Sequence, residues 1–401
     1  MADGDGRTAP CSAAACTPAG PGVAMKGPVP AGTDRPTIGL MMIVRNEAAV
    51  LPRLAASVRD HIDYWTVVDT GSTDNTVEVA GQVFAGKPGQ VLEDEWKGFG
   101  PSRNVALGAA EPHTDWLLAL DADHTLHGEL DGTALALDVD ALDIEERYGE
   151  LRYWLPRLLR AGRGWHWKGR THEYVTTRGH EASHERTSSC WVEHLADGGS
   201  RASKFHRDID LLSQDWQESP DDPRTAFYMA RTYDDLGEDA LAVDWYRRRR
   251  SLGGWDEERF YSAYRAGACL LRSGATDEGC GLLWRAWGER PWRSEPLVEL
   301  ASHYRRTEAW GPGWLACQAA FAHCGARPLG GSSDVPRDSL FVDAAVTRWR
   351  IAYEASICAW YVGERRTGRS LVRYLLDMQG LPRDIRQSVE SNSHYYETGA
   401  G

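Results

Sequence analysis

Apolar residues gather along the first third of the chain in four runs of strand length. The runs are Thr37–Val44, Trp65–Val68, Gln90–Asp94 and Trp116–Leu120. Helix-compatible segments lie between them, at Glu47–Arg59, Asp74–Phe84 and Pro101–Ala110. This alternation of strand and helix predicts a parallel sheet with helices on both faces. Sheets of this kind bind their ligands at the carboxyl ends of the strands.

The chain changes character between Tyr148 and Leu195, where Trp, His and Gly are more frequent. Leu151–Pro156 and Cys190–Leu195 have the composition of two further strands, with a long polar segment between them. We therefore expect this stretch to complete the α/β domain that starts at Thr37.

An internal repeat runs through the helical part of the chain from about Ser200 onward. Tyr233, Leu270 and Tyr304 hold equivalent positions, 37 and 34 residues apart. Small residues stand three positions before and nine positions after each of them: Ala230, Gly267 and Ala301, then Ala242, Gly279 and Gly313. A period near 34 with small residues where helices cross is typical of tetratricopeptide-type helix pairs. An unrelated helical bundle is the alternative.

These patterns divide the chain into five parts. Residues 1–36 are rich in Gly, Ala and Pro and are expected to form a disordered leader. The α/β domain takes residues 37–212, the repeats take 213–330, a C-terminal helical pair takes 331–390, and 391–401 form a tail. The expected pair consists of Ser339–Val362 and Thr367–Met378, and it follows the polar linker Gly330–Asp334.

Charge and cysteine content narrow the possible function classes. The 401 residues include 45 Lys and Arg against 58 Asp and Glu, a net charge of −13, which argues against nucleic acid as a partner. No run approaches the roughly 18 apolar residues of a membrane span. The N-terminal residues also lack the apolar core that drives secretion, so we expect a cytoplasmic protein. The eight cysteines include no C-x-x-C motif, which predicts buried free thiols.

Polar, chemically capable residues follow three of the predicted strands. They are Val44–Glu47 after the first strand, Asp69–Asp74 after the second and Asp121–Asp123 after the fourth. An Asp-x-Asp pair directly after a strand brings two carboxylates to one rim, where they can hold a divalent ion and leave positions for phosphates. Such an ion neutralises a diphosphate leaving group and acts as a Lewis acid.

A resemblance to family 2 glycosyltransferases of the GT-A fold rests on four segments: MMIVRNEAAVLPRLAASV, WTVVDTGSTDNTVEVA, WKGFGPSRNVALGAA and DWLLALDADH. The branch whose second turn reads D-[TS]-G-S-T-D is the most similar. Thr70 stands where the commoner turn has a second Asp, and His124 stands where this branch often has Glu. The helical segment RTAFYMARTYDDLGEDALAVDWY resembles the tetratricopeptide tail of some members, including S-glycosyltransferases that modify peptide cysteines. The fold implied is an N-terminal Rossmann-like GT-A domain, which binds a nucleotide-sugar, followed by an all-α tetratricopeptide-like domain.

The resemblance implies a nucleotide-sugar donor, with a UDP-sugar favoured, and assigns roles to individual residues. Asp69 and Thr70 are expected to contact the nucleobase. Arg103 and Asn104 are expected to lie near the ribose and the diphosphate. The full expected nucleotide-sugar site comprises Val44, Arg45, Glu47, Asp69, Thr70, Arg103, Asn104, Asp121, Ala122, Arg201 and Lys204. The expected ligands of Mn²⁺ or Mg²⁺ are Asp121, Asp123 and His194, the last because many GT-A enzymes complete the metal shell with a late histidine. Arg201, Lys204 and Arg207 would clamp the departing diphosphate, or form a solvated basic turn.

The pair His172-Glu173 is expected on the acceptor side. An inverting transfer is a single displacement, so one base must take the proton of the attacking acceptor. Glu173 is the preferred base, with His172 positioning it or the acceptor. A structural histidine beside a surface glutamate is the alternative. Trp165 and Trp167 would stack on a sugar or belong to the core.

Two competing functions come from other classes. His180-Glu181-Ala182-Ser183-His184 fits the H-E-x-x-H signature of zinc peptidases, which requires both histidines on one helix face. The surrounding residues are polar, so we interpret it as a chance match. The second alternative is a non-catalytic scaffold whose repeats bind a partner, against which the intact Asp121-Ala122-Asp123 argues.

The sequence therefore predicts a metal-dependent, inverting glycosyltransferase that uses a UDP-sugar, with glucose or N-acetylglucosamine favoured. The acceptor is expected to be Ser, Thr or Cys of a peptide or protein, while a lipid-linked or small-molecule acceptor stays open. The repeats are expected to select or orient that acceptor, since stacked helix pairs form a concave groove. They would also serve for homodimer formation.

Overall fold

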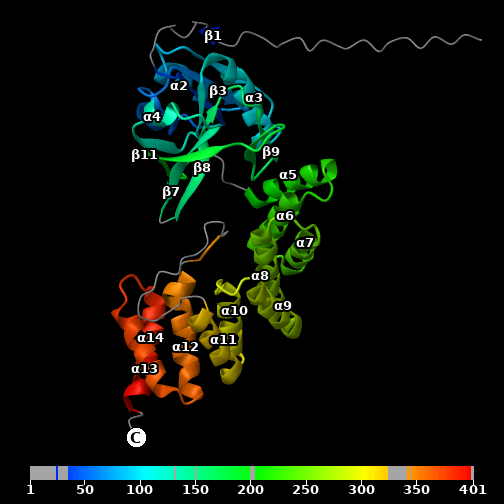
Figure 1. Cartoon of the computed structure of the whole chain (residues 1–401), viewed down its shortest axis with the longest axis vertical. Helices are drawn as coiled ribbons and strands as arrows, with labels where there is room; N and C mark the ends of the chain where they lie inside the picture. Colours follow the sequence, from blue (N-terminus) through cyan, green and yellow to red (C-terminus); the bar gives the residue numbers. More distant parts are fainter. Residues whose placement is uncertain are drawn as a thin grey trace, which may run out of the picture. The chain divides into compact units, whose positions relative to one another are not determined.

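The computed structural model describes residues 24–25, 35–130, 132–149, 151–198, 204–323, 341–343 and 345–398 (Figure 1). The chain divides into two compact units, Met1–Ala202 and Ser203–Gly401. The sequence had put this boundary after residue 212, ten residues later. Helix α5, Lys204–Glu218, therefore lies in the second unit. The linker at 330–334 and most of the leader lie outside the described residues.

The first unit is built of strands and helices in alternation. Its elements are β1 (Ala24–Met25), β2 (Ile38–Val44), α1 (Leu51–Val58), β3 (Tyr64–Asp69), α2 (Thr76–Val83), β4 (Gly89–Glu93), α3 (Phe99–Ala110), η1 (Glu111–His113), β5 (Trp116–Ala119), β6 (His124–Gly128), α4 (Gly132–Leu135), β7 (Ala141–Tyr148), β8 (Leu151–Arg160), β9 (Trp165–Lys168), β10 (Tyr174–Thr177) and β11 (His184–His194). The four strands and three helices expected before residue 121 are all present.

Nine strands form one sheet in the order β1-β4-β3-β2-β5-β8-β7-β11-β6. Strands β4, β3, β2 and β5 run parallel, as predicted. The rest of the sheet is mixed, because β8 returns antiparallel to both β5 and β7, and β6 runs antiparallel to β11. The prediction of a parallel sheet is confirmed for those four strands, whereas the later strands make the sheet mixed, with a hairpin that pairs Tyr148 with Leu151.

Strand β1 comes from within the expected leader. Ala24 and Met25 pair antiparallel with Gln90 and Gly89 of β4. Strand β4 would otherwise be the edge of the sheet with unpaired backbone groups, which is a ready template for another strand.

The central strand β2 is buried on both faces, as a parallel strand between two helical layers must be. Leu40, Met42 and Val44 join the core that includes α1 and α2, whereas Met41 and Ile43 join the core that includes α3. Helix α1 presents Leu51, Leu54, Ala55 and Val58 to the first core, the spacing of one helix face. The two cores fix the sheet and hold the carboxyl ends of its strands in place.

The second unit is helical. Its elements are α5 (Lys204–Glu218), α6 (Pro223–Asp235), α7 (Asp239–Ser251), α8 (Asp256–Arg272), α9 (Thr276–Glu289), α10 (Glu295–Arg306), α11 (Trp310–His323), η2 (Val346–Arg350), α12 (Ile351–Tyr361), α13 (Arg365–Asp377) and α14 (Arg383–Thr398). Consecutive helices pack as the pairs α6–α7, α8–α9 and α10–α11, and the first helices of neighbouring pairs also touch.

The small residues of the repeat lie where these helices cross. A side chain at Gly267 would meet Leu283 and the carbonyl oxygen of Gly279, and one at Gly279 would meet the carbonyl oxygen of Gly267 at 3.0 Å. Ala230 and Ala242 are fully buried in the equivalent pair. The structure thus has the repeated helix pairs of a tetratricopeptide-like domain, as the period predicted.

Asp234 of α6 joins neighbouring helices through buried charge. Its carboxylate accepts from Arg265 Nε at 2.7 Å and from Arg272 Nη2 at 2.7 Å, both on α8, and from the hydroxyl of Tyr246 at 3.0 Å. Burial by itself raises the pKa of Asp234, but its bonds to Arg265 and Arg272 outweigh that effect and hold the pKa below its ordinary value.

The C-terminal part is longer than the expected pair. Helix α14 follows α13 and reaches Thr398, so helix occupies much of the predicted tail. The described cysteines Cys190, Cys269, Cys280, Cys317 and Cys358 are free, as predicted. Among the described residues, no helix combines the length and apolar character needed to cross a bilayer.

Candidate functional site

Three loops expected to carry chemistry meet at one edge of the sheet. They follow β3, β2 and β5, which are neighbours in that order and run parallel. Thr70 connects the first two loops, because its backbone N–H and its hydroxyl both donate to the carbonyl oxygen of Val44 at 3.0 Å. Asn46, which has a positive φ of 58°, accepts from the backbone N–H of Thr73 at 2.7 Å.

Asp69 is buried and holds its own turn together. Its carboxylate accepts from the backbone N–H groups of Gly71 at 3.2 Å and Ser72 at 3.0 Å, and from the hydroxyl of Ser72. These hydrogen bonds hold the turn that begins at Asp69 in one conformation at the edge of the sheet. Whether Asp69 and Thr70 also contact a nucleobase remains a prediction.

The backbone after β11 passes close to two carboxylates. A Cβ built on Gly198 would lie 3.0 Å from Glu47 Oε1 and 3.4 Å from Asp123 Oδ2. The same segment is fixed by Asp197, which receives two hydrogen bonds from Arg53 of α1, at 2.7 and 2.8 Å. Glycine at 198 thus lets the chain approach Glu47 and Asp123, which come from different loops.

Arg103 of α3 lies between two carboxylates. Its Nη2 donates to Asp121 Oδ1 at 2.7 Å, and its Nε donates to Glu173 Oε1 at 2.8 Å. The Arg103 side chain is 7% exposed, and its Cζ lies 5.1 Å from the ring centre of Trp167. Burial by itself raises the pKa of Asp121, but Arg103 and His124 hold it well below its ordinary value. Asp121 is therefore ionised at neutral pH.

Asn104 holds the hairpin β9–β10 to α3. Its Nδ2 donates to the carbonyl oxygen of Trp167 at 2.8 Å, and its Oδ1 accepts from the N–H of Trp167 at 2.7 Å. Both polar groups of its amide are thus bonded to backbone. Trp165 and Trp167 are buried in the core beside α3, which supports the core alternative for both rings.

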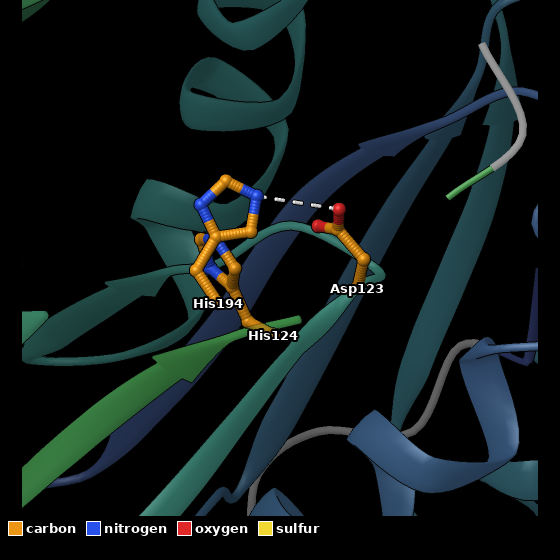
Figure 2. A group of neighbouring side chains, drawn as sticks. All are labelled: Asp123, His124 and His194. Atoms are coloured by element: carbon orange, nitrogen blue, oxygen red, sulfur yellow. Dashed lines mark ion pairs between the residues drawn. The ribbon is translucent and has the colours of Figure 1, made fainter. Parts of the chain in front are cut away.

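Asp123, His124 and His194 form a group with the composition of a metal site, and their ligand atoms lie within 4.8 Å of one another (Figure 2). His194 Nε2 lies 3.4 Å from Asp123 Oδ2. The sequence predicted Asp123 and His194 here. The third member is His124 instead of Asp121, whose Oδ1 is bonded to Arg103.

The proton positions on His124 follow from its surroundings. Its Nδ1 accepts from the backbone N–H of Asp121 at 3.1 Å, so this nitrogen carries no proton. Burial lowers the pKa of His124 to about 4, with Arg157 contributing. The ring is therefore neutral with its proton on Nε2, and that nitrogen has no lone pair free for a metal. Asp123 can ligate as it stands, whereas His194 can ligate only when a cation replaces the proton on Nε2, the nitrogen that faces Asp123.

Glu146 of β7 supports His194 from the other side. Its Oε1 lies 3.5 Å from His194 Nδ1 and accepts from the hydroxyl of Tyr153 at 2.7 Å, while Arg157 Nε donates to Oε2 at 3.0 Å. The hydrogen bonds that His194 donates to Asp123 and then to Glu146 raise its pKa to about 9. A carboxylate behind a ligating imidazole fixes its orientation and strengthens it as a ligand. Glu146 was not among the site residues predicted from the sequence.

The expected acceptor pair lies where β10 begins. Glu173 is 12% exposed at its side chain and is bonded to Arg103, and His172 has a positive φ of 50°. Helix α3 packs close to this loop, because a Cβ at Gly100 would collide with the carbonyl oxygen of Gly169. Glu173, Arg103 and Asp121 are thus joined by hydrogen bonds, with Arg103 in the middle.

The H-E-x-x-H segment does not form a peptidase site. Residues 180–183 are outside any helix, and His184 begins strand β11. His180 Nε2 lies 3.4 Å from Asp140 Oδ2, whereas His184 Nδ1 lies 2.9 Å from Asp143 Oδ1. The two histidines are therefore paired with different carboxylates, and the zinc peptidase alternative was wrong.

The structure does not test the basic residues expected to clamp a diphosphate. Arg201 lies outside the described residues. Lys204 and Arg207 belong to helix α5 of the second unit. Their role stays a prediction.

Comparison with known proteins connects this geometry to a family. Residues 40–137 match the family model described as glycosyl transferase family 2. The TPR repeat-containing protein Synpcc7942_0270 of Synechococcus elongatus is 43% identical over 96 residues, 24% of this chain and 22% of that protein. The SPbeta prophage-derived glycosyltransferase SunS of Bacillus subtilis is 26% identical over 230 residues, 54% of each chain. This chain thus spans about half, or less, of the length of these relatives.

Among solved structures, MamA 41-end from Desulfovibrio magneticus RS-1 is similar at a TM-score of 0.32 and 12% identity, over 50% of this chain and 89% of that chain. That similarity is too low to bear on function. The matched residues 40–137 contain most of β2 and all of β3, β4 and β5, together with Glu47, Asp69, Arg103 and Asp123. The first unit of this chain therefore contains a domain of glycosyl transferase family 2, and it is followed by a unit of tetratricopeptide-like helix pairs.

Proposed function

We propose that this protein is a metal-dependent, inverting glycosyltransferase that moves a sugar from a UDP-sugar to a nucleophilic side chain. The observation that carries the proposal is the pairing of Asp123 with His194 at the carboxyl edge of the sheet, 3.4 Å apart. It lies on a domain of glycosyl transferase family 2. The glycosyltransferase SunS, similar over 230 residues, supports the same reaction class.

The residues present fit a divalent cation. Asp123 offers a carboxylate oxygen and His194 an imidazole nitrogen, a donor set suited to Mn²⁺ and acceptable to Mg²⁺. When bound there, the cation would supply positive charge to the diphosphate that leaves the sugar. Asp121 contributes negative charge at the same rim, and Glu146 orients His194 from behind.

Glu173 is our candidate for the base. As the acceptor oxygen or sulfur bonds to the anomeric carbon, its proton passes to the Glu173 carboxylate, and the bond from that carbon to the diphosphate oxygen breaks. Arg103 holds the Glu173 carboxylate in place by donating to Oε1 at 2.8 Å, and Oε2 would take the proton of the acceptor. His172, next in the chain, would position the acceptor.

Our proposal for the substrates rests on the resemblance to family 2 glycosyltransferases and on the helix pairs of the second unit. We favour UDP-glucose or UDP-N-acetylglucosamine as donor, and Ser, Thr or Cys of a peptide as acceptor. Stacked helix pairs offer an extended surface for such a peptide.

The test is release of UDP and transfer of sugar from UDP-glucose and UDP-N-acetylglucosamine to Ser-, Thr- and Cys-containing peptides, followed by mass spectrometry. Transfer is expected with Mn²⁺ and lost with EDTA. Glu173→Gln should lower kcat by at least about 100-fold, whereas Glu181→Ala, in the H-E-x-x-H segment, should leave it unchanged. If the protein binds UDP but turns over no UDP-sugar, the proposal of an enzyme is contradicted and the non-catalytic scaffold is favoured.

A further inference from the structure

Two neighbouring helices of the second unit share a surface of aromatic rings and one arginine. We define this α6–α8 aromatic surface by Tyr228 and Arg231 of α6 and Tyr261 of α8, with the buried ring of Phe227 beneath. Phe227 lies 5.3 Å from Tyr228 and 5.7 Å from Tyr261 between ring centres. These are edge-to-face contacts of the kind that hold aromatic clusters together.

The contacts of Arg231 are with aromatic rings. Its Cζ lies 5.9 Å from the ring centre of Tyr228 and 6.0 Å from that of Tyr261. By contrast, Arg265 one helix away is bonded to Asp234 at 2.7 Å. A guanidinium bordered by ring faces is a binding site for a further aromatic ring, since cation and ring attract.

A residue from a distant part of the chain occupies this surface. The Arg231 Cζ lies 3.9 Å from the ring centre of Phe341, which lies 5.3 Å from Tyr261 and 6.3 Å from Phe227 between ring centres. Phe341 is nevertheless 42% exposed and has a positive φ of 49°, a conformation that a bulky residue rarely adopts. Phe341 is thus placed by its ring contacts, and it is only half covered.

The same segment makes a second contact two residues later. Asp343 Oδ2 lies 3.1 Å from Arg350 Nη1, and Arg350 Nη2 lies 3.1 Å from Glu299 of α10. Residues 341–343 therefore touch the aromatic surface through a ring and an arginine beside α10 through a carboxylate. The segment thus contacts α6 and α8 through the ring of Phe341. Through Asp343, which also accepts from the backbone N–H of Ala345, it pairs with Arg350 of η2, and Arg350 is in turn bonded to Glu299 of α10.

We propose that the α6–α8 aromatic surface is a docking site for an extended peptide that presents an aromatic side chain followed two residues later by a carboxylate, and that Phe341–Asp343 occupies it as an internal ligand. The internal segment competes at an effective concentration that can reach the order of millimolar, so it weakens binding of an external peptide without abolishing it. The site is defined by binding alone and does not depend on sugar transfer.

The experiment measures fluorescence anisotropy of a labelled peptide, DSLFVDA, which repeats residues 338–344, with the full chain and no nucleotide. Phe341→Ala should bind it at least about tenfold more tightly than the native protein. Val342→Ala, a change at an equally exposed neighbour, should bind like the native protein. Adding Arg231→Ala to Phe341→Ala should remove the gain, and the peptide DSLAVDA should not compete.

Thermal melting of each variant shows whether it is folded, and Phe341→Gly provides a second variant because glycine tolerates the positive φ. Equal affinity of Phe341→Ala and Val342→Ala would overturn the proposal, as would equal binding of the peptide without Phe. Because neither arm involves a UDP-sugar, failure here leaves the proposed transfer reaction untouched, and absence of transfer leaves this binding result untouched.

Discussion

Arg103 Nη2 lies 2.7 Å from Oδ1 of Asp121, so the first carboxylate of the Asp-x-Asp motif is held by a cation from α3. The same guanidinium reaches Glu173, on the loop before β10. Helix α3 therefore fixes two carboxylates that the sequence placed in separate roles, one at the donor and one at the acceptor. Both carboxylates are held by one buried guanidinium.

Arg103→Gln should destabilise the first unit. The change leaves Asp121 and Glu173 without their shared cation, and breaking such a pair costs about 2 kcal/mol here, less than for a fully buried pair because Asp121 is 32% exposed. Urea denaturation measures the loss. In Arg160→Gln the carboxylate left without its partner is Asp138, which is 93% exposed. That variant should lose no more than about 1 kcal/mol, including the bond of Arg160 to the Leu137 carbonyl and its contact with the Trp116 ring. Equal stability of the two variants would contradict this role for Arg103.

Asn104 is expected to act on stability through the hairpin that carries Glu173. Asn104→Ala removes two hydrogen bonds to the backbone of Trp167, which should cost roughly 2 kcal/mol. Asn104→Asp should be at least as damaging, because it replaces the donor to the Trp167 carbonyl with an oxygen. Thermal denaturation checks both, against Val105→Ala at an exposed neighbouring position. A melting temperature of Asn104→Asp equal to that of the native protein would refute the assignment.

The second unit should show a pH-dependent stability that traces to Asp234. Its pKa is lowered from 3.8, so it contributes stability that is fully present above that value and is lost as pH falls through the lower, folded-state pKa. Asp234→Asn should cost about 3 kcal/mol at neutral pH. The difference in the free energy of unfolding between Asp234→Asn and the native protein should become smaller below about pH 4. Urea titrations at several pH values measure this difference. Asp244→Asn, at a side chain that is 76% exposed, is the control. A difference in the free energy of unfolding that stays constant down to pH 3 would argue against the role of Asp234.

The sequence predicted the parallel half of the sheet because each of its strands is a continuous apolar run, as in β2. It missed β7, Ala141–Tyr148, because that strand has one polar face. Buried and half-buried positions do alternate along β7, with the period of two that a strand has. Several of these positions carry charged side chains, which hid the pattern in the sequence. Glu145 and Glu146 are adjacent in sequence, and only pairing with β8 and β11 decides that Glu146 is the one buried.

The site was predictable to the same extent. Asp123 and His194 were predicted as ligands through a motif and a resemblance, and the structure brings the two side chains together although 71 positions separate them. Their role as metal ligands stays a proposal. The exclusion of His124 as a ligand was not predictable, because it depends on a hydrogen bond from the backbone of Asp121. The same holds for Asn104, whose bonds to Trp167 depend on how the hairpin packs on α3.

The central claim is that Asp123 and His194 hold a divalent cation beside a nucleoside diphosphate, and a thermal-shift measurement with UDP tests it most directly. UDP at a hundred times its Kd should stabilise the protein by about 2.7 kcal/mol, and Mn²⁺ should enlarge the shift in melting temperature. Asp123→Asn should lose the part of the shift that Mn²⁺ adds, while Asp138→Asn, at a 93% exposed position, should keep it. A melting temperature that does not respond to UDP with Mn²⁺, or an undiminished Mn²⁺ effect in Asp123→Asn, would contradict the account.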